Sequence, residues 1–148
     1  MRNPSLNPKL DARLWTRIAA AKGKRPAFQK SLCECSSEEL IELAALAQYA
    51  AHAICAPEQG PFIPSLNEYL SEDSTSDFTN WIVDQGQARW LELLGADEAT
   101  LAAAFEGSNN KGVAAAATIF AVASKRMGPD AYFDALERLL DADAHPIE

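Results

Sequence analysis

The segment from Ser71 to Gly95 constrains the fold more than any other part of the chain. It begins with acidic and hydroxyl side chains, as a helix start does, and it ends on a glycine. Between these ends, apolar side chains recur at helical spacing on one face and include Trp81 and Trp90. The pattern predicts one helix over about residues 76–94, with both tryptophans in the core and the other helices packed around it.

Two features of this central helix need a structural explanation. Ser74 or Ser76 is expected to cap its N-terminus, since a hydroxyl oxygen can accept a hydrogen bond from a backbone N–H of the first turn. Gly86 lies in its interior, where a glycine costs about 1 kcal/mol relative to alanine. We expect close packing against another helix at Gly86, and a ligand that approaches the backbone is the alternative.

Caps and loops divide the rest of the chain. Ser36 and Glu39 have the spacing of a capping box, which predicts a helix from residue 37 to about residue 55. Three prolines and a glycine make residues 56–64 a loop. One or two helical turns are expected at residues 65–70.

The fold class follows from these helix signals. Val, Ile and Thr never alternate over a useful length, so no strand is predicted. We therefore expect an all-α fold, a single-domain bundle of about six or seven short helices around the central one. The domain is expected to cover residues 1–148, with an irregular basic arm at 1–9 and a frayed tail at 141–148.

Length and composition exclude several classes of protein. A chain of 148 residues that is 48% hydrophobic fits one globular domain. No apolar run approaches the ~18 residues that span a bilayer, and the N-terminus lacks the hydrophobic block of a secretory signal. We therefore expect a cytoplasmic protein without membrane contact. Three cysteines at irregular spacing predict neither a disulfide framework nor a metal site, and no cofactor is expected.

Charge is distributed unevenly along the chain. Residues 1–30 hold eight basic side chains and one acidic one, a net charge of +7, whereas residues 31–148 hold five basic and 20 acidic ones, a net charge of −15. An acidic body repels phosphate, so nucleic acid is not an expected partner. Two interpretations stay open: the basic segment lies on the acidic body and partly neutralises it, which we favour, or the acidic surface captures a basic partner protein.

The central segment also carries a recognisable pattern. After an acidic, serine-rich stretch it runs Asp77-Phe78-x-x-Trp81-Ile82-x-x-Gln85-Gly86. This pattern resembles the bacterial domain-of-unknown-function family 4240, over most of residues 12–135 and most specifically over residues 71–91. Thr79 stands where that family has an arginine. The resemblance implies a small, helical, cytoplasmic bacterial domain and no particular activity.

The best case for an enzyme lies at the start of the central helix. The carboxylates of Glu72, Asp73 and Asp77 could bind Mg²⁺ or Ca²⁺ or transfer protons. However, the chain has no glycine-rich phosphate loop, no His-Glu-x-x-His and no Gly-x-Ser-x-Gly. We therefore expect no catalytic residue, and a carboxylate- or metal-dependent enzyme is the least favoured hypothesis.

A protein-binding role fits the composition better. A small acidic protein can inhibit a basic toxin or effector by offering carboxylates in place of its anionic substrate. We expect such an inhibitor, most specifically an immunity protein that neutralises a bacterial toxin. The alternative is a regulatory or scaffolding domain, including a homodimer. The candidate contact residues are the acids expected on the surface: Glu58, Glu68, Glu72, Asp73 and Asp84.

Overall fold

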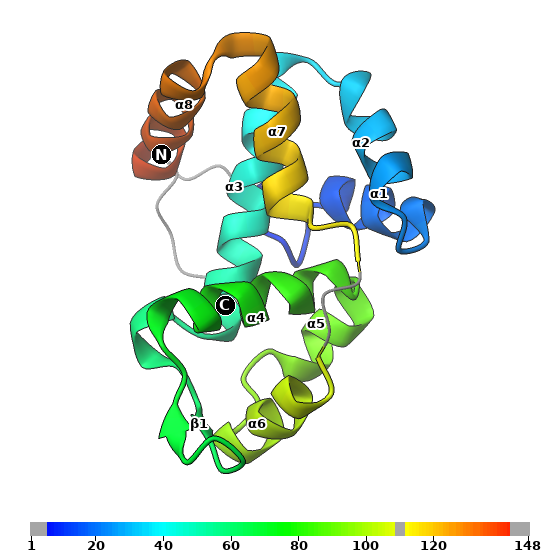
Figure 1. The fold of residues 1–148 in the computed structure, drawn as a ribbon. Helices are drawn as coiled ribbons and strands as arrows, with labels where there is room; N and C mark the ends of the chain where they lie inside the picture. The colour runs from blue at the N-terminus through cyan, green and yellow to red at the C-terminus, as the bar shows by residue number, and fades with distance from the viewer. Residues whose placement is uncertain (1–5, 109–111, 143–148) are drawn as a thin grey trace.

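The helix α3 (Ser37–Ile54) runs through the middle of the molecule in a computed structural model that describes residues 6–108 and 112–142 (Figure 1). Ten of its 18 residues are buried, and five of these ten are alanines. It contacts α1, α4, α5, α7 and α8. A helix that is surrounded in this way needs short side chains, because they let neighbouring backbones approach closely.

The described residues form eight α-helices and almost no strand, which confirms the predicted all-α single-domain bundle. A short 3₁₀ helix, η2 (Pro57–Gln59), follows α3. Two short strands come next, β1 (Phe62–Ile63) and β2 (Glu68–Tyr69). The other α-helices are α1 (Arg13–Ala21), α2 (Arg25–Cys33), α4 (Glu72–Asp84), α5 (Gln87–Leu93), α6 (Glu98–Glu106), α7 (Ala115–Met127) and α8 (Pro129–Ala142).

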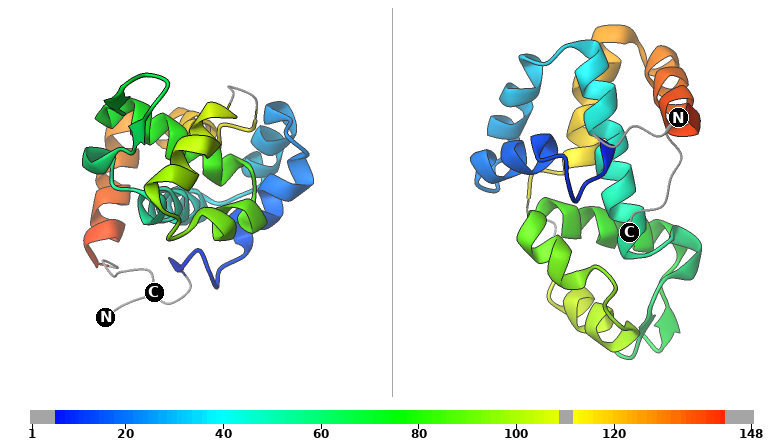
Figure 2. Two further views of the ribbon diagram at one scale, coloured as in Figure 1. Left: turned by 90° about the horizontal axis from the view of Figure 1, so that it is seen from below. Right: turned by 180° about the vertical axis from the view of Figure 1, so that it is seen from behind.

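The helices form two groups along α3. In one group, α7 lies along α3, with α8 on one side and α1 and α2 on the other (Figures 1 and 2). In the other group, α4 crosses the C-terminal end of α3, and α5, α6 and the two strands lie beyond it. One core joins both groups, because buried apolar residues from all eight helices belong to the same cluster.

The prediction of one continuous helix over residues 76–94 is wrong. The chain forms α4 and then α5, and Gly86 separates them with φ 99° and ψ 170°. The expected close packing against another helix does not occur, since a Cβ placed at Gly86 would meet nothing within 4 Å. Only glycine adopts this backbone conformation readily, so Gly86 ends one helix and redirects the chain into the next. The element that the other helices surround is α3.

Serine side chains cap the starts of α3 and α4, although the prediction for α4 chose the wrong residue. Ser36 accepts a hydrogen bond from the backbone N–H of Glu39 at 3.1 Å, as the sequence predicts. The helix α4 begins earlier than expected, because Ser71 rather than Ser74 or Ser76 is its cap. Ser71 accepts from the N–H of Ser74 at 3.2 Å, which places Glu72 and Asp73 in the first turn.

Residues 65–70 do not form the helical turns that the sequence predicts. They complete a small antiparallel hairpin in which Phe62 pairs with Tyr69 and Ile63 with Glu68. The rings of Phe62 and Tyr69 meet edge to face, with centroids 5.1 Å apart. Asn67 has φ 53° at the turn, a conformation that asparagine tolerates better than most residues.

The basic N-terminal segment packs on the acidic body, as the favoured interpretation predicts. Arg13 Nη1 lies 2.7 Å from Glu42 Oε1, and Arg17 Nη2 lies 4.0 Å from Glu39 Oε2. Within the predicted arm, Leu6 is completely buried, so residues 6–9 are irregular but packed. Residues 1–5 of the arm and 143–148 of the predicted tail lie outside the described residues, whereas residues 141–142 belong to α8.

The segment Ser37–Gln59, which contains α3, is long and apolar enough to cross a membrane by length and composition alone. Its most apolar window is 56% buried inside the protein. The core helix of a soluble protein passes the same test, so this segment is weak evidence for a membrane span.

Tryptophans join the two groups of helices. Trp90 of α5 is completely buried, and its Nε1 donates to the carbonyl oxygen of Ala50 in α3 at 2.8 Å. Trp15 of α1 lies against it, with ring centroids 5.3 Å apart. Trp15 Nε1 in turn donates to the carbonyl oxygen of Pro8 at 2.7 Å. The predicted core position of Trp90 is therefore confirmed, and the partly buried Trp81 packs against the same core.

The variant Gly86→Ala measures the strain at the α4–α5 junction. We expect the free energy of unfolding, measured by urea denaturation, to fall by about 1–3 kcal/mol, because the observed backbone conformation is nearly restricted to glycine. Gly107→Ala is the control, since Gly107 has φ −90° and an added Cβ would make only ordinary contacts, 3.8–3.9 Å from the carbonyl oxygens of Ala104 and Ala103. It should be neutral or stabilise by up to about 1 kcal/mol. Equal effects of the two variants would contradict this account of Gly86.

Two matched variants test the role of Trp90. Trp90→Phe removes a buried hydrogen bond and leaves a cavity, so the free energy of unfolding should fall by about 2–4 kcal/mol. In Trp81, Nε1 is buried without a hydrogen-bond partner among the described residues. Trp81→Phe should therefore cost less than about 1 kcal/mol, since it also removes an unsatisfied donor. A larger loss for Trp81→Phe than for Trp90→Phe would refute this assignment.

Candidate functional site

Four of the five predicted contact acids lie at one end of the molecule. Glu58 comes from η2, Glu68 from β2, and Glu72 and Asp73 from the first turn of α4. All four are exposed. Because η2 packs against α4 and the hairpin precedes α4 directly, these elements gather below α3 in Figure 1. We call these four side chains the acidic end.

Tight backbone packing fixes the acidic end. A Cβ at Gly60 would clash with Thr75 Oγ1 and with the carbonyl oxygen of Leu70, so only glycine lets the loop lie this close to α4. Thr75 is completely buried, and its hydroxyl donates to the carbonyl oxygen of Ser71 at 2.8 Å. The loop that carries Glu58 is therefore held directly against the helix that carries Glu72 and Asp73.

The charge of the acidic end is not neutralised within the described residues. No lysine or arginine occurs between Lys30 and Arg89 in the sequence. None of the four carboxylates forms an ion pair with another described residue, whereas the arginines of α1 are paired with Glu39 and Glu42. The negative field of this end therefore extends into solvent.

Asp84 differs from the other four, and the prediction that it is an exposed acid is wrong. It is half-buried at the end of α4, and its Oδ1 accepts from the backbone N–H of Ala115 at 2.9 Å. Ala114, the residue before α7, has no side chain that could cap, so the carboxylate of Asp84 caps α7 from another helix. Burial raises the pKa of Asp84 to about 6, although the backbone hydrogen bonds from Ala115 and Ala114 oppose this rise.

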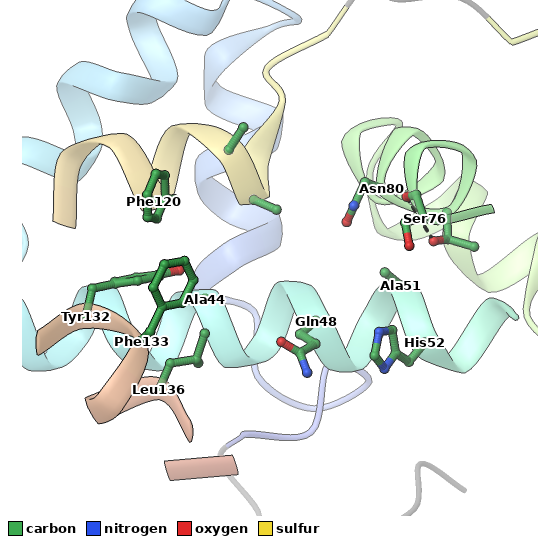
Figure 3. Close-up of a pocket in the computed structure, with 13 residues that line it drawn as sticks. Ala44, Gln48, Ala51, His52, Ser76, Asn80, Phe120, Tyr132, Phe133 and Leu136 are labelled. Atoms are coloured by element: carbon green, nitrogen blue, oxygen red, sulfur yellow. Dashed lines mark hydrogen bonds between the residues drawn. The ribbon is translucent and has the colours of Figure 1, made fainter. Parts of the chain in front are cut away.

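A groove with a volume of about 480 Å³ lies between α3, α4, α7 and α8. We call it the helix groove. One end is apolar and is formed by Phe120, Tyr132, Phe133 and Leu136, while polar side chains form the other end (Figure 3). Four alanines complete the lining: Ala44, Ala51, Ala116 and Ala117. Sequence analysis did not predict this site, because its lining comes from four helices that only the tertiary structure brings together.

The polar end of the helix groove combines side chains from two helices. Gln48 and His52 are one turn apart on α3, and Ser76 and Asn80 are one turn apart on α4 (Figure 3). The side chains of Gln48, His52 and Asn80 have no hydrogen bond to another described residue. They are therefore available to a ligand.

The described residues offer no metal or nucleophile chemistry that would define an active site. No group of three or more His, Cys, Asp or Glu side chains is positioned to hold a metal ion in residues 6–108 and 112–142. The three free cysteines differ in exposure: Cys33 is exposed, Cys35 is buried and Cys55 is intermediate. Burial raises the pKa of the thiols of Cys35 and Cys55, which disfavours the reactive thiolate.

Comparison with known proteins identifies no relative of this chain. No family model, no curated protein and no solved structure matches this chain. The resemblance to family 4240 therefore stays a prediction.

Asp84→Asn tests the capping carboxylate through its pH dependence. Because the folded-state pKa is raised from 3.8 to about 6, Asp84 contributes stability that is complete below about pH 4 and is lost as the pH rises through about 6. Asparagine keeps the acceptor oxygen but does not ionise. Relative to wild type, the variant should therefore gain about 2–3 kcal/mol in the free energy of unfolding between pH 4 and pH 7.

Asp97→Asn is the control with the opposite sign. Asp97 caps α6 by accepting from the N–H of Thr100 at 2.8 Å. Hydrogen bonding to the Thr100 side chain, and then to its backbone N–H, lowers the pKa of Asp97. Its contribution is present above about pH 4 and is lost as the pH falls further. Parallel pH profiles of Asp84→Asn and wild type would refute the assignment of Asp84.

Proposed function

We propose that this chain is a protein-binding inhibitor, most specifically an immunity protein that neutralises a bacterial toxin or effector with a basic surface. The observation that carries the proposal is the acidic end: four exposed carboxylates, held on packed elements, without a neutralising partner among the described residues. The proposed site of action is the bacterial cytoplasm.

The physical basis is electrostatic complementarity. A toxin that binds an anionic substrate presents a basic surface, and carboxylates can occupy that surface in place of the substrate. Unpaired negative charge also speeds the encounter with a basic partner, and salt screens this effect. The close packing of the loop with Glu58 on the helix with Glu72 and Asp73 favours binding further, because little loop ordering is required there when the complex forms.

A regulatory or scaffolding domain is the second candidate. Its support is an apolar surface on α8, where Phe133 is 54% exposed and stacks on Phe120 with centroids 5.3 Å apart. Exposed aromatic residues are common in contacts between proteins, including those of homodimers. A concentration-independent dimer in light scattering would favour this candidate over the inhibitor.

Co-expression tests the proposed inhibitor. The adjacent reading frame should encode a larger toxin or effector, and co-expression of the present chain should restore growth. The double variant Glu72→Lys with Asp73→Lys should lower the association rate of the complex by about tenfold at low salt, measured by stopped-flow or surface plasmon resonance. Wild-type binding should weaken as salt is raised.

The matched control is Glu34→Lys with Asp130→Lys. These exposed acids lie near the α2–α3 and α7–α8 connections, at the opposite end of the molecule, and the change in net charge is the same (Figure 1). We expect this pair to change the association rate by less than about threefold. If both double variants act alike, or if no complex forms with the neighbouring gene product, the proposal fails.

A further inference from the structure

The helix groove has the dimensions and the lining of a small-molecule site. Its volume of about 480 Å³ falls within the range of about 300–1,000 Å³ that ligand pockets occupy. Four helices of the bundle line it, and the space between helices is a common place for such sites in helical proteins. Its apolar and polar residues are also segregated, so a ligand would bind in a defined direction.

The apolar end presents a wall of three rings. Phe120, Tyr132 and Phe133 contact one another with centroid distances of 5.2–5.3 Å. Tyr132 is only 4% exposed, which fixes the wall against the core, while Phe133 is exposed. Leu136 and Ala44 extend this surface. An aryl or alkyl body would bury apolar area here without displacing any internal contact.

The polar end can accept hydrogen bonds from a head group that carries several donors. Gln48, Ser76 and Asn80 each carry a side-chain oxygen that can accept, and an ammonium group has three N–H donors. Asp73 lies on the same face of α4, three residues before Ser76. A cationic head would therefore find acceptors and a nearby carboxylate.

Charge disfavours an anionic head at the same place. The lining of the helix groove contains no lysine or arginine, and the net charge of the whole chain is −8. A carboxylate or phosphate would lose hydration without gaining a lysine or arginine partner, and His52 is the one lining side chain that could become a cation. A neutral alcohol should bind with an affinity between those of the amine and the carboxylate, because it offers a single hydrogen-bond donor.

We propose that the helix groove binds a small amphipathic amine, with its aryl or alkyl body against the ring wall of α7 and α8 and its ammonium head between α3 and α4. The lining of this ligand site contains none of the four acids of the acidic end, although Asp73 of that end lies near the proposed position of the head.

Three probes with one body and different heads test the site: 4-phenylbutylamine, 4-phenylbutan-1-ol and 4-phenylbutanoate. Each is titrated into the full-length chain and followed by amide NMR chemical shifts. The amine should bind at least about tenfold more tightly than the carboxylate, with the alcohol between them. The largest shifts should occur at Gln48, Asn80 and Phe120. Affinities within about twofold of one another, or shifts confined to residues outside the helix groove, would overturn the proposal.

Matched variants separate occupation of the groove from general attraction to an acidic protein. Ala117→Leu places a larger side chain in the lining, at an exposed position of α7. It should lower the affinity for the amine by about tenfold. Ala121→Leu, at an exposed position of the same helix outside the lining, should leave binding unchanged. Equal affinity in these two variants would overturn the proposal.

A second pair of substitutions tests the position of the head. Gln48→Met with Asn80→Leu keeps the approximate side-chain volume and removes both amide groups. The preference for the amine over the alcohol should fall to less than about twofold, while binding of the alcohol itself changes little. An unchanged preference for the amine would place its head elsewhere and overturn the proposed orientation.

Discussion

Close approach of backbones along α3 is the constraint on which the rest of the structure depends. Five alanines are buried on this helix, and their short side chains let α7 pack along it and α4 pack across its C-terminal end (Figure 1). Larger side chains at these positions would separate the two groups of helices that share the core. The hydrogen bond from Trp90 to the carbonyl oxygen of Ala50 depends on the same closeness, because the indole reaches a backbone atom that short side chains leave accessible.

Local signals predicted the helix boundaries where a side chain or a backbone property sets them. Ser36 caps the helix that it was expected to cap. The break at Gly86 was missed because the apolar pattern continues across it in α5, so spacing alone resembled one long helix. Periodicity records which face is buried, and it does not record the direction in which the chain continues after a glycine.

The candidate sites differ in how far sequence could predict them. Glu58, Glu68, Glu72 and Asp73 were predicted as exposed acids, and all four are exposed. Asp84 is also a carboxylate, yet its environment is set by α7. Its hydrogen-bond partner Ala115 lies 31 positions further along the chain, where a local pattern cannot reveal it. The helix groove needs the packing of four helices, and no local pattern encodes that arrangement.

The carbonyl oxygen of Pro8 has a consequence for how the chain is made. It accepts hydrogen bonds from Trp15 in α1 and from Gln87 in α5. Gln87 lies 79 positions after Pro8 in the chain. During synthesis the first partner leaves the ribosome almost together with Pro8, whereas the second follows only after more than half of the chain has been translated. This junction therefore closes late, and a fragment that ends before α5 lacks the contact that ties its first residues to the opposite group of helices.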